Sequence, residues 1–239
     1  MRLRAKPPVF GFLLTVLVAF GAQAQSPLRA HFDLTRNGRP VKDSSQVVVW
    51  LTPVGASAPM PRQDPSKIPQ LAQKNKKFHP SLVVIPIGGK VEFPNRDPFF
   101  HNVFSMFEGK RFDLGLYEGG TTRFVQFDKP GISFIFCNIH AQMSAVVIAL
   151  ATPYYAISDA RGSISMPDVP PGRYQMQVFH ASVAPDNLRA LDRQITVTSG
   201  ESSLGTFSLA ETDLLAGHKN KYGRDYDRPE PDSPAYARP

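Results

Sequence analysis

Four residues whose side chains can bind a soft metal are gathered in two short stretches of the chain. Cys137, His140 and Met143 follow one another at intervals of three, and His101 lies 36 residues before the cysteine. A thiolate, two imidazoles and a thioether are the donors of a trigonal copper site with a weak axial methionine. The pattern predicts a type 1 copper centre with one ion per chain, bound by His101, Cys137, His140 and Met143.

Cys137 is the only cysteine of the chain. A lone cysteine is most often a small apolar core residue, and taken by itself it would indicate nothing more. The histidine and methionine that follow it reverse this interpretation. A soft thiolate beside two imidazoles favours copper, which also has the highest affinity of the divalent metals for such donors.

Strands on both sides of this motif would hold the ligands in place. In the run 131–137, Ile132, Phe134 and Phe136 alternate with Ser133, Ile135 and Cys137, so the cysteine falls at the end of a strand. The apolar run 144–150 predicts the next strand, and the two strands would fix both ends of the loop between them. His101 follows a separate loop after Phe93, and its neighbour Asn102 is expected to hydrogen-bond across to the Cys137 loop, a role beside the ligands.

The remaining sequence predicts an all-β protein with no helical period of note. Residues 31–53, 77–146 and 154–209 consist of short alternating or β-branched runs separated by Gly, Pro, Asn and Asp turns. Residues 58–69 are rich in proline and are expected to form a linker. Residues 211–239 are polar, rich in Asp, Arg, Pro and Tyr, and predict a disordered tail.

The first 24 residues have the form of a secretory signal peptide. Three basic residues precede an apolar run that ends in Ala22-Gln23-Ala24, which predicts cleavage after Ala24 and export to the periplasm. The run is too short to span a bilayer, so no membrane span is expected after cleavage. Loss of the three basic residues lowers the formal charge from +7 to +4, with 24 Lys and Arg against 20 Asp and Glu. This balance is only mildly basic and gives no indication of nucleic-acid binding.

The middle of the chain resembles the cupredoxins, the small blue copper proteins, and its short Cys-x-x-His-x-x-Met loop resembles that of the amicyanin-like and plastocyanin-like members. The resemblance covers roughly residues 73–150, within a predicted copper domain of residues 70–151. It rests on motifs in the family's order: Phe78, Pro80, Gly88-Gly89, Phe93-Pro94-Asn95, His101-Asn102-Val103 and the loop 137–143. It implies a Greek-key β-sandwich in which His101, Cys137, His140 and Met143 bind copper and pass single electrons.

The flanking segments resemble a carboxypeptidase regulatory-like β-sandwich divided into two parts. Asn37-Gly38-Arg39-Pro40-Val41 comes before the copper domain, and Ser158 to Ser163 and Val169 to Tyr174 come after it. We therefore predict a second small β-sandwich, formed by residues 26–57 and 153–210, into which the cupredoxin domain is inserted. Two consecutive domains with an N-terminal strand extension are the alternative.

The predicted function is that of a one-electron carrier, not an enzyme, between periplasmic partners such as a c-type cytochrome or a dehydrogenase. Copper delivery and a β-sandwich binding module with an accessory copper site remain alternatives. Delivery proteins would be expected to carry tracts rich in Met or His, whereas the six methionines here are scattered. A multicopper oxidase or nitrite reductase would need further histidine pairs, and the chain has no His-x-His motif.

Overall fold

The computed structural model of the protein describes residues 27–106, 108–200, 203–212 and 217–226. Nearly all regular structure in these ranges is β-strand, and the helix described there is the short α1 (Pro185–Arg189). The all-β prediction is confirmed. The predicted signal peptide, residues 1–24, lies outside the described residues. Within those ranges, no helix is both long enough and apolar enough to cross a membrane.

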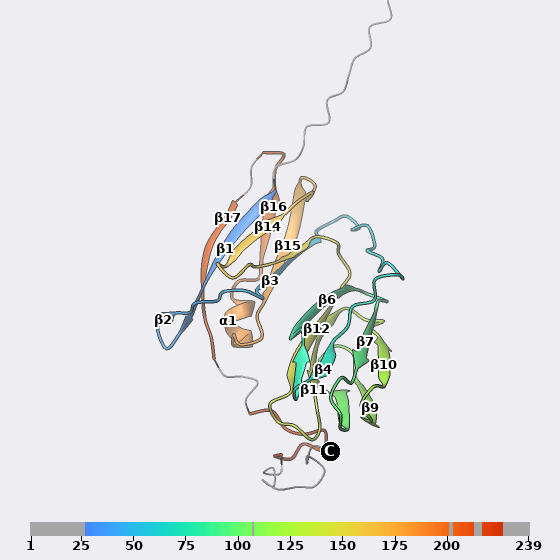
Figure 1. Ribbon diagram of the computed structural model, residues 1–239. Coiled ribbons are helices and arrows are strands. Elements are labelled where there is room, and N and C mark those ends of the chain that lie inside the picture. Colours follow the sequence, from blue (N-terminus) through green and yellow to red (C-terminus); the bar gives the residue numbers. More distant parts are fainter. Residues whose placement is uncertain (1–26, 107, 201–202, 213–216, 227–239) are drawn as a thin grey trace, which may run out of the picture.

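The strands form two groups, which lie one above the other in Figure 1. The outer sandwich contains β1 (Leu28–Arg36), β2 (Arg39–Pro40), β3 (Val48–Pro53), β13 (Tyr155–Ile157), β14 (Ser163–Met166), β15 (Gly172–Phe179), β16 (Arg193–Val197) and β17 (Ser203–Ala210). The central sandwich contains β4 (Ala72–Lys74), β5 (Lys77–His79), β6 (Leu82–Pro86), β7 (Lys90–Pro94), β8 (His101–Ser105), β9 (Phe112–Tyr117), β10 (Thr122–Gln126), β11 (Gly131–Phe136) and β12 (Ser144–Leu150).

Both sheets of the outer sandwich combine strands from the two ends of the chain. In one sheet β1 lies between β14 and β17, with β2 paired to β1, and in the other the strand order is β13-β3-β15-β16. Residues of β1 alternate between buried and more exposed positions, as expected for a strand with one face on a core, and Phe32 and Leu34 are fully buried there. The second sandwich is therefore discontinuous, with the central sandwich inserted between its strands.

The central sandwich packs a large sheet, in the order β6-β12-β11-β8-β9, against the strand pairs β10-β7 and β4-β5. Its core is built from side chains of both layers, among them Phe93, Val103, Tyr117, Phe127 and Ile135. β8, β11 and β12 meet in the large sheet, so the start of β8 and the loop between β11 and β12 are brought to the same region. These are the segments that carry the predicted ligands.

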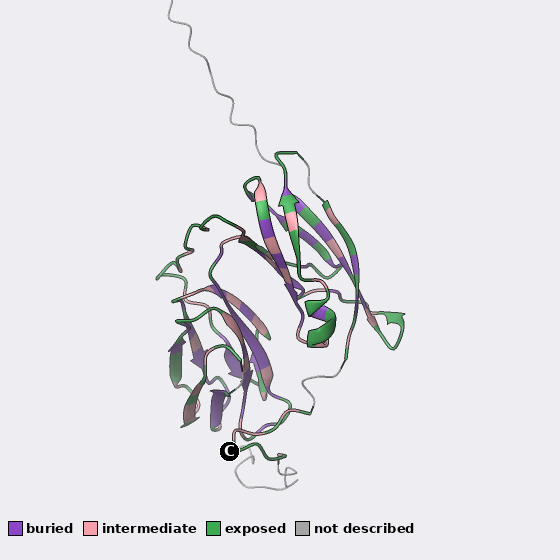
Figure 2. Ribbon diagram, turned by 180° about the vertical axis from the view of Figure 1, so that it is seen from behind, coloured by how far each residue is buried: buried purple, intermediate pink, exposed green. Residues whose placement is uncertain are grey.

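The large sheet has a buried apolar surface on each of its two faces. Ile135 of β11 and Val147 of β12 lie in the central core, whereas Phe134, Val146 and Ile148 pack with the core of the outer sandwich. Figure 2 shows buried residues along the strands between the two sandwiches. A strand buried on both faces needs apolar residues at nearly every position, which explains the unbroken apolar run of β12. The shared sheet thus joins the two sandwiches.

The predicted linker has no regular secondary structure, whereas part of the predicted disordered tail is folded. Residues 58–69 form no strand or helix, and Gln63 ties this segment to β7 by hydrogen bonds of 2.8 and 2.7 Å with the backbone carbonyl and N–H of Lys90. Within the predicted disordered tail, residues 217–226 form a turn that contacts the central sandwich, so the prediction is wrong for that segment. Residues 213–216 and 227–239 lie outside the described residues.

Candidate metal centre

The Cys137 loop is closed at its base by the two strands that flank it. β11 ends at Phe136, which pairs with Ser144, the first residue of β12. Within the loop the Cys137 N–H donates to the Met143 carbonyl at 3.3 Å, and the Met143 N–H donates to the His140 carbonyl at 3.0 Å. These bonds fold the loop back on itself, so that residues three and six positions after the cysteine lie beside it.

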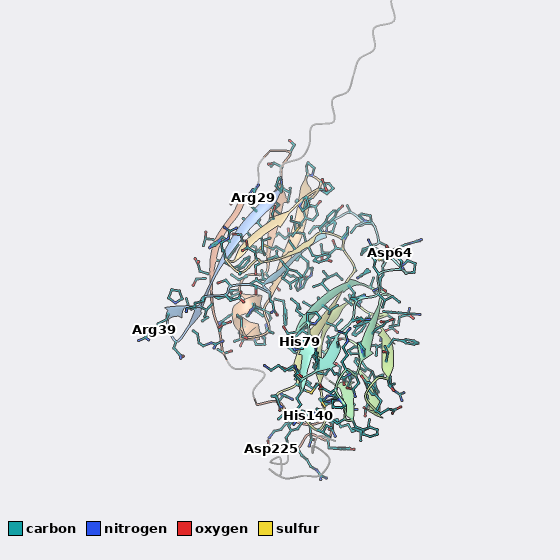
Figure 3. All side chains as sticks on the ribbon, in the orientation of Figure 1. Arg29, Arg39, Asp64, His79, His140 and Asp225 are labelled. Carbon is teal, nitrogen blue, oxygen red and sulfur yellow. The ribbon has the colours of Figure 1, made fainter. Side chains whose placement is uncertain are left out.

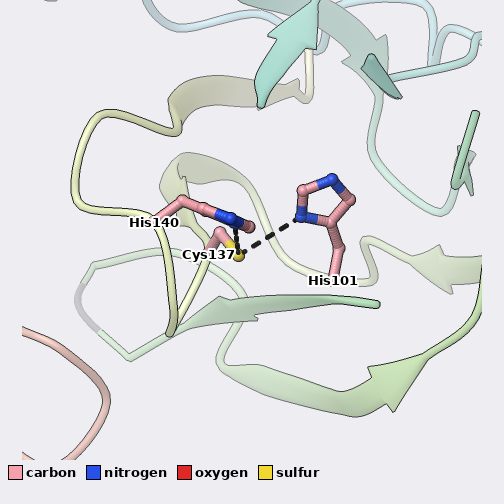
Figure 4. Close-up of side chains that lie close together, drawn as sticks. All are labelled: His101, Cys137 and His140. Carbon is pink, nitrogen blue, oxygen red and sulfur yellow. Dashed lines mark hydrogen bonds between the residues drawn. The ribbon is translucent and has the colours of Figure 1, made fainter. Parts of the chain in front are cut away.

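Three of the predicted ligands meet in the interior of the central sandwich. His101 Nδ1 lies 3.8 Å from Cys137 Sγ, and His140 Nδ1 lies 3.6 Å from the same sulfur atom (Figure 4). The candidate ligand atoms of the three residues all lie within 4.8 Å of one another, and all three residues are buried. Among the described residues they are the group of three or more His, Cys, Asp or Glu side chains that could hold a metal ion.

The spacing of these atoms fits a bound metal ion. A trigonal ion with metal–sulfur bonds of about 2.3 Å and metal–nitrogen bonds of about 2.05 Å separates sulfur from nitrogen by about 3.8 Å. The two sulfur–nitrogen distances, 3.6 and 3.8 Å, are close to this value. A thiolate with two imidazoles is the donor set of copper in such sites, so the residues present fit copper.

The orientation of the His101 ring is set by a buried carboxylate. His101 Nε2 lies 2.8 Å from Asp97 Oδ2, and the Asp97 carboxylate also accepts the backbone N–H groups of Asn75 and Lys76 at 2.6 and 2.9 Å. A proton on Nε2 leaves the Nδ1 lone pair directed at the site. Burial would raise the pKa of Asp97, but its hydrogen bonds with Lys76, His101 and Asn75 outweigh this and hold the pKa below its usual value. No motif in the sequence singles out Asp97, although it lies four residues before a predicted ligand.

The sulfur of Cys137 is surrounded by backbone N–H groups. Burial raises the pKa of the Cys137 thiol, and hydrogen bonds from the backbone N–H groups of Asn102, Ile139 and His140 oppose this rise. These donors stabilise negative charge on the sulfur, which is the form that binds a metal. On balance the pKa of the thiol stays above its ordinary value, so the metal-free protein holds Cys137 neutral at neutral pH, and the N–H groups reduce the cost of ionising it when a metal ion binds.

Asn102 is connected both to the cysteine and to strand β9. Its backbone N–H, not its side chain, reaches the cysteine sulfur. The side-chain amide instead donates to Asp113 Oδ1 of β9 at 2.7 Å.

Met143 is fully buried and belongs to the core of the central sandwich. Its backbone closes the loop through hydrogen bonds with Cys137 and His140, so Met143 lies beside both residues in the folded turn. Its role as the axial ligand stays a prediction.

The comparisons with known proteins concern the fold. No protein-family model matches the sequence, and no curated protein matches it. Among solved structures, the chain is similar to a purple cupredoxin from Nitrosopumilus maritimus, with 21% sequence identity and a TM-score of 0.31. The similarity covers 34% of this chain and 99% of that chain. It is also similar to amicyanin from Paracoccus versutus, with 22% sequence identity and a TM-score of 0.31. This similarity covers 36% of this chain and 85% of the amicyanin chain.

A third similar structure is a copper-containing nitrite reductase from Thermus scotoductus SA-01, with 22% identity and a TM-score of 0.34. The similarity covers 49% of this chain and 28% of the reductase chain, so the matched part is under a third of the reductase. All three TM-scores are below 0.5, and the assignment of the site therefore rests on its own residues. The central sandwich holds a buried cluster of two histidines and a cysteine that could bind a metal ion.

The two histidines make the stability of the metal-free protein depend on pH. Burial, followed by repulsion from His101 and Lys76, lowers the pKa of His140 to about 4. Below a pH of about 6.5 the unfolded chain takes up a proton on this residue that the folded protein does not accept until about pH 4. The free energy of unfolding is therefore expected to fall between pH 6.5 and 4, by roughly 2 kcal/mol for this residue.

Denaturant unfolding of the metal-free protein at pH 7, 5.5 and 4.5 measures this effect. The His140→Asn variant is the matched comparison, because His101 and His180 titrate in both proteins, and its stability should fall less over the same range. Equal losses in the two proteins would show that His140 is not held neutral in the folded state.

Proposed function

We propose that the protein is an exported type 1 copper protein that carries single electrons between redox partners in the periplasm. The observation that supports this most directly is the cluster of His101, Cys137 and His140, whose ligand atoms lie within 4.8 Å of one another in a buried position. Copper bound there would supply a one-electron couple between Cu(I) and Cu(II). Met143 would be the weak axial ligand of the one ion bound per chain.

The residues around the site suit fast electron transfer because they are held before any metal binds. Asp97 fixes the ring of His101, and backbone hydrogen bonds fix the loop that carries His140. Burial excludes water from the ligands, since His101 and Cys137 are fully buried and His140 is 6% exposed. A ligand set held in this way needs little rearrangement when the charge on the metal changes by one.

Copper delivery is the competing function, and the enclosed ligand set favours the carrier. A delivery protein has to hand its ion to a partner, which requires ligands that a partner can reach. The deciding experiment loads the protein with Cu(II), reduces it with ascorbate and reoxidises it with ferricyanide in the presence of a copper chelator. A carrier loses and regains its visible band over many cycles and keeps its copper. Loss of copper to the chelator in the first reduced state would favour delivery.

Electrons are proposed to pass through the surface above His140. Ile139 and Phe100, the neighbours of two ligands, are 38% and 55% exposed, and Ala141 is exposed beside them. An apolar patch of this kind suits brief docking of a redox partner such as a c-type cytochrome or a dehydrogenase, because weak electron-transfer complexes use small interfaces. The outer sandwich is proposed to be carboxypeptidase regulatory-like.

Replacing the axial ligand is expected to raise the reduction potential. In Met143→Leu a weak donor to Cu(II) is removed, so the oxidised state loses more stabilisation than the reduced state, while the apolar volume in the core is nearly kept. Voltammetry of the copper-loaded variant should give a higher potential with the visible band retained. Met106→Leu is the matched control, because Met106 lies at the surface, and it should leave the potential unchanged. A lower potential for Met143→Leu would refute the axial role.

A further inference from the structure

A segment near the end of the described chain is folded against the metal loop. Residues 217–226, here called the clasp, turn around Asn220, whose side-chain oxygen accepts the backbone N–H groups of Tyr222 and Arg224 at 3.0 and 3.1 Å. The Asn220 N–H also donates to the Arg224 carbonyl at 2.9 Å. The clasp therefore has a structure of its own, and it presents three part-buried side chains, those of His218, Lys221 and Tyr226, to the central sandwich.

The first set of clasp contacts is made to the strand end that carries the cysteine. The Tyr226 hydroxyl donates to the backbone carbonyl of Cys137 at 2.8 Å, and the Lys221 N–H donates to the side-chain oxygen of Asn138 at 3.0 Å. The ring of His218 stacks on Phe136, with the centroids 4.1 Å apart and the planes 19° from parallel. Figure 3 shows Asp225 of the clasp at the same end of the molecule as His140. The clasp thus holds three consecutive residues, 136 to 138.

A second chain of contacts connects the clasp to Asn102 of β8. The Lys221 ammonium group lies 2.8 Å from Asp113 Oδ2, and the other oxygen of that carboxylate accepts the side-chain amide of Asn102. The backbone N–H of Asn102 is one of the donors to the Cys137 sulfur. Lys221 therefore acts on the sulfur through Asp113 and Asn102, and Tyr226 acts on it through the cysteine backbone.

We propose that Tyr226 and Lys221 are positioning residues for the metal centre, which hold the Cys137 sulfur against its backbone N–H donors and shield it from solvent. The proposal rests on the proposed function of the site. N–H groups directed at the sulfur stabilise the reduced state, because reduction leaves more negative charge on the thiolate. The clasp should therefore raise the reduction potential of the bound metal and slow its loss.

The first test uses the metal-free protein and its single thiol. Tyr226→Phe removes one hydroxyl, and Tyr222→Phe is the matched control because Tyr222 is 68% exposed on the same segment. The measured quantity is the rate at which Cys137 reacts with a disulfide reagent such as dithionitrobenzoate. This rate is expected to rise about fivefold in Tyr226→Phe, because one net hydrogen bond that keeps the thiol shielded contributes about 1 kcal/mol. A similar rise is expected in Lys221→Met. Rates equal to that of Tyr222→Phe in both variants would overturn the proposal.

The second test uses the copper-loaded full-length protein. Tyr226→Phe is expected to lower the reduction potential, shift the visible band and release copper to a chelator about fivefold faster than Tyr222→Phe does. A role in folding alone would lower the melting temperature without moving the potential, and that result would overturn the positioning role. If the wild-type protein takes up no copper with a visible band, the proposed function fails, whereas the thiol reaction of the metal-free protein still decides whether the clasp holds Cys137.

Discussion

The Cys137→Ser variant is expected to lose the strong visible absorption of the copper-loaded protein completely. The absorption in such sites arises from charge transfer from a thiolate to Cu(II), and a serine hydroxyl is neither soft nor ionised at neutral pH. His101, His140 and Met143 would remain in place, so some copper can still bind without colour. The visible spectrum of the loaded variant, recorded beside wild type at the same copper content, measures the effect.

The variant should nevertheless fold, which keeps the experiment interpretable. Serine has almost the volume of cysteine, and its buried hydroxyl would meet the backbone N–H groups of Asn102, Ile139 and His140, which can donate to it. A melting temperature close to that of metal-free wild type is therefore expected. A folded Cys137→Ser protein with the full visible band would exclude Cys137 as a copper ligand.

The isolated fragment 153–210 is expected to be unfolded. It contains β13 to β17 but lacks β1, which lies between β14 and β17, and β3, which lies between β13 and β15. Each sheet of the outer sandwich thus loses a middle strand, and with these strands go the fully buried side chains of Phe32 and Leu51. Strands left with unpaired edges and half a core cannot offset the conformational entropy lost on folding.

Circular dichroism with thermal melting tests this expectation. The fragment alone should show no cooperative transition, and mixing it with the complementary fragment 26–152, which supplies β1, β3 and the central sandwich, should restore one. The complementation serves as the control, because it shows that the fragment is chemically intact. A cooperative melt of 153–210 alone would mean that β1 and β3 are dispensable.

The sequence alone determined the class of fold and singled out His101, Cys137 and His140, which the structure brings together as a possible metal site. The spacing of Cys137, His140 and Met143 is a local property, because a loop between two strands folds residues three and six positions after the cysteine back toward it. Strand alternation is equally local, so the all-β fold and the end of a strand at Cys137 could be read from the run 131–137. The turn motifs on either side of the central domain indicated a second, divided sandwich.

Only the tertiary structure decided which groups surround the ligands. Asp97 orients His101, and the backbone N–H of Asn102 contacts the sulfur of Cys137. Both contacts depend on the packing of the loop before β8, and of β8 itself, against the Cys137 loop. The clasp at 217–226 has a polar composition without periodicity, and its structure comes from Asn220 and from contacts with residues more than 80 positions earlier. Hydrogen bonds between residues so far apart leave no pattern in a single sequence, since neither partner has a spacing that reveals the other.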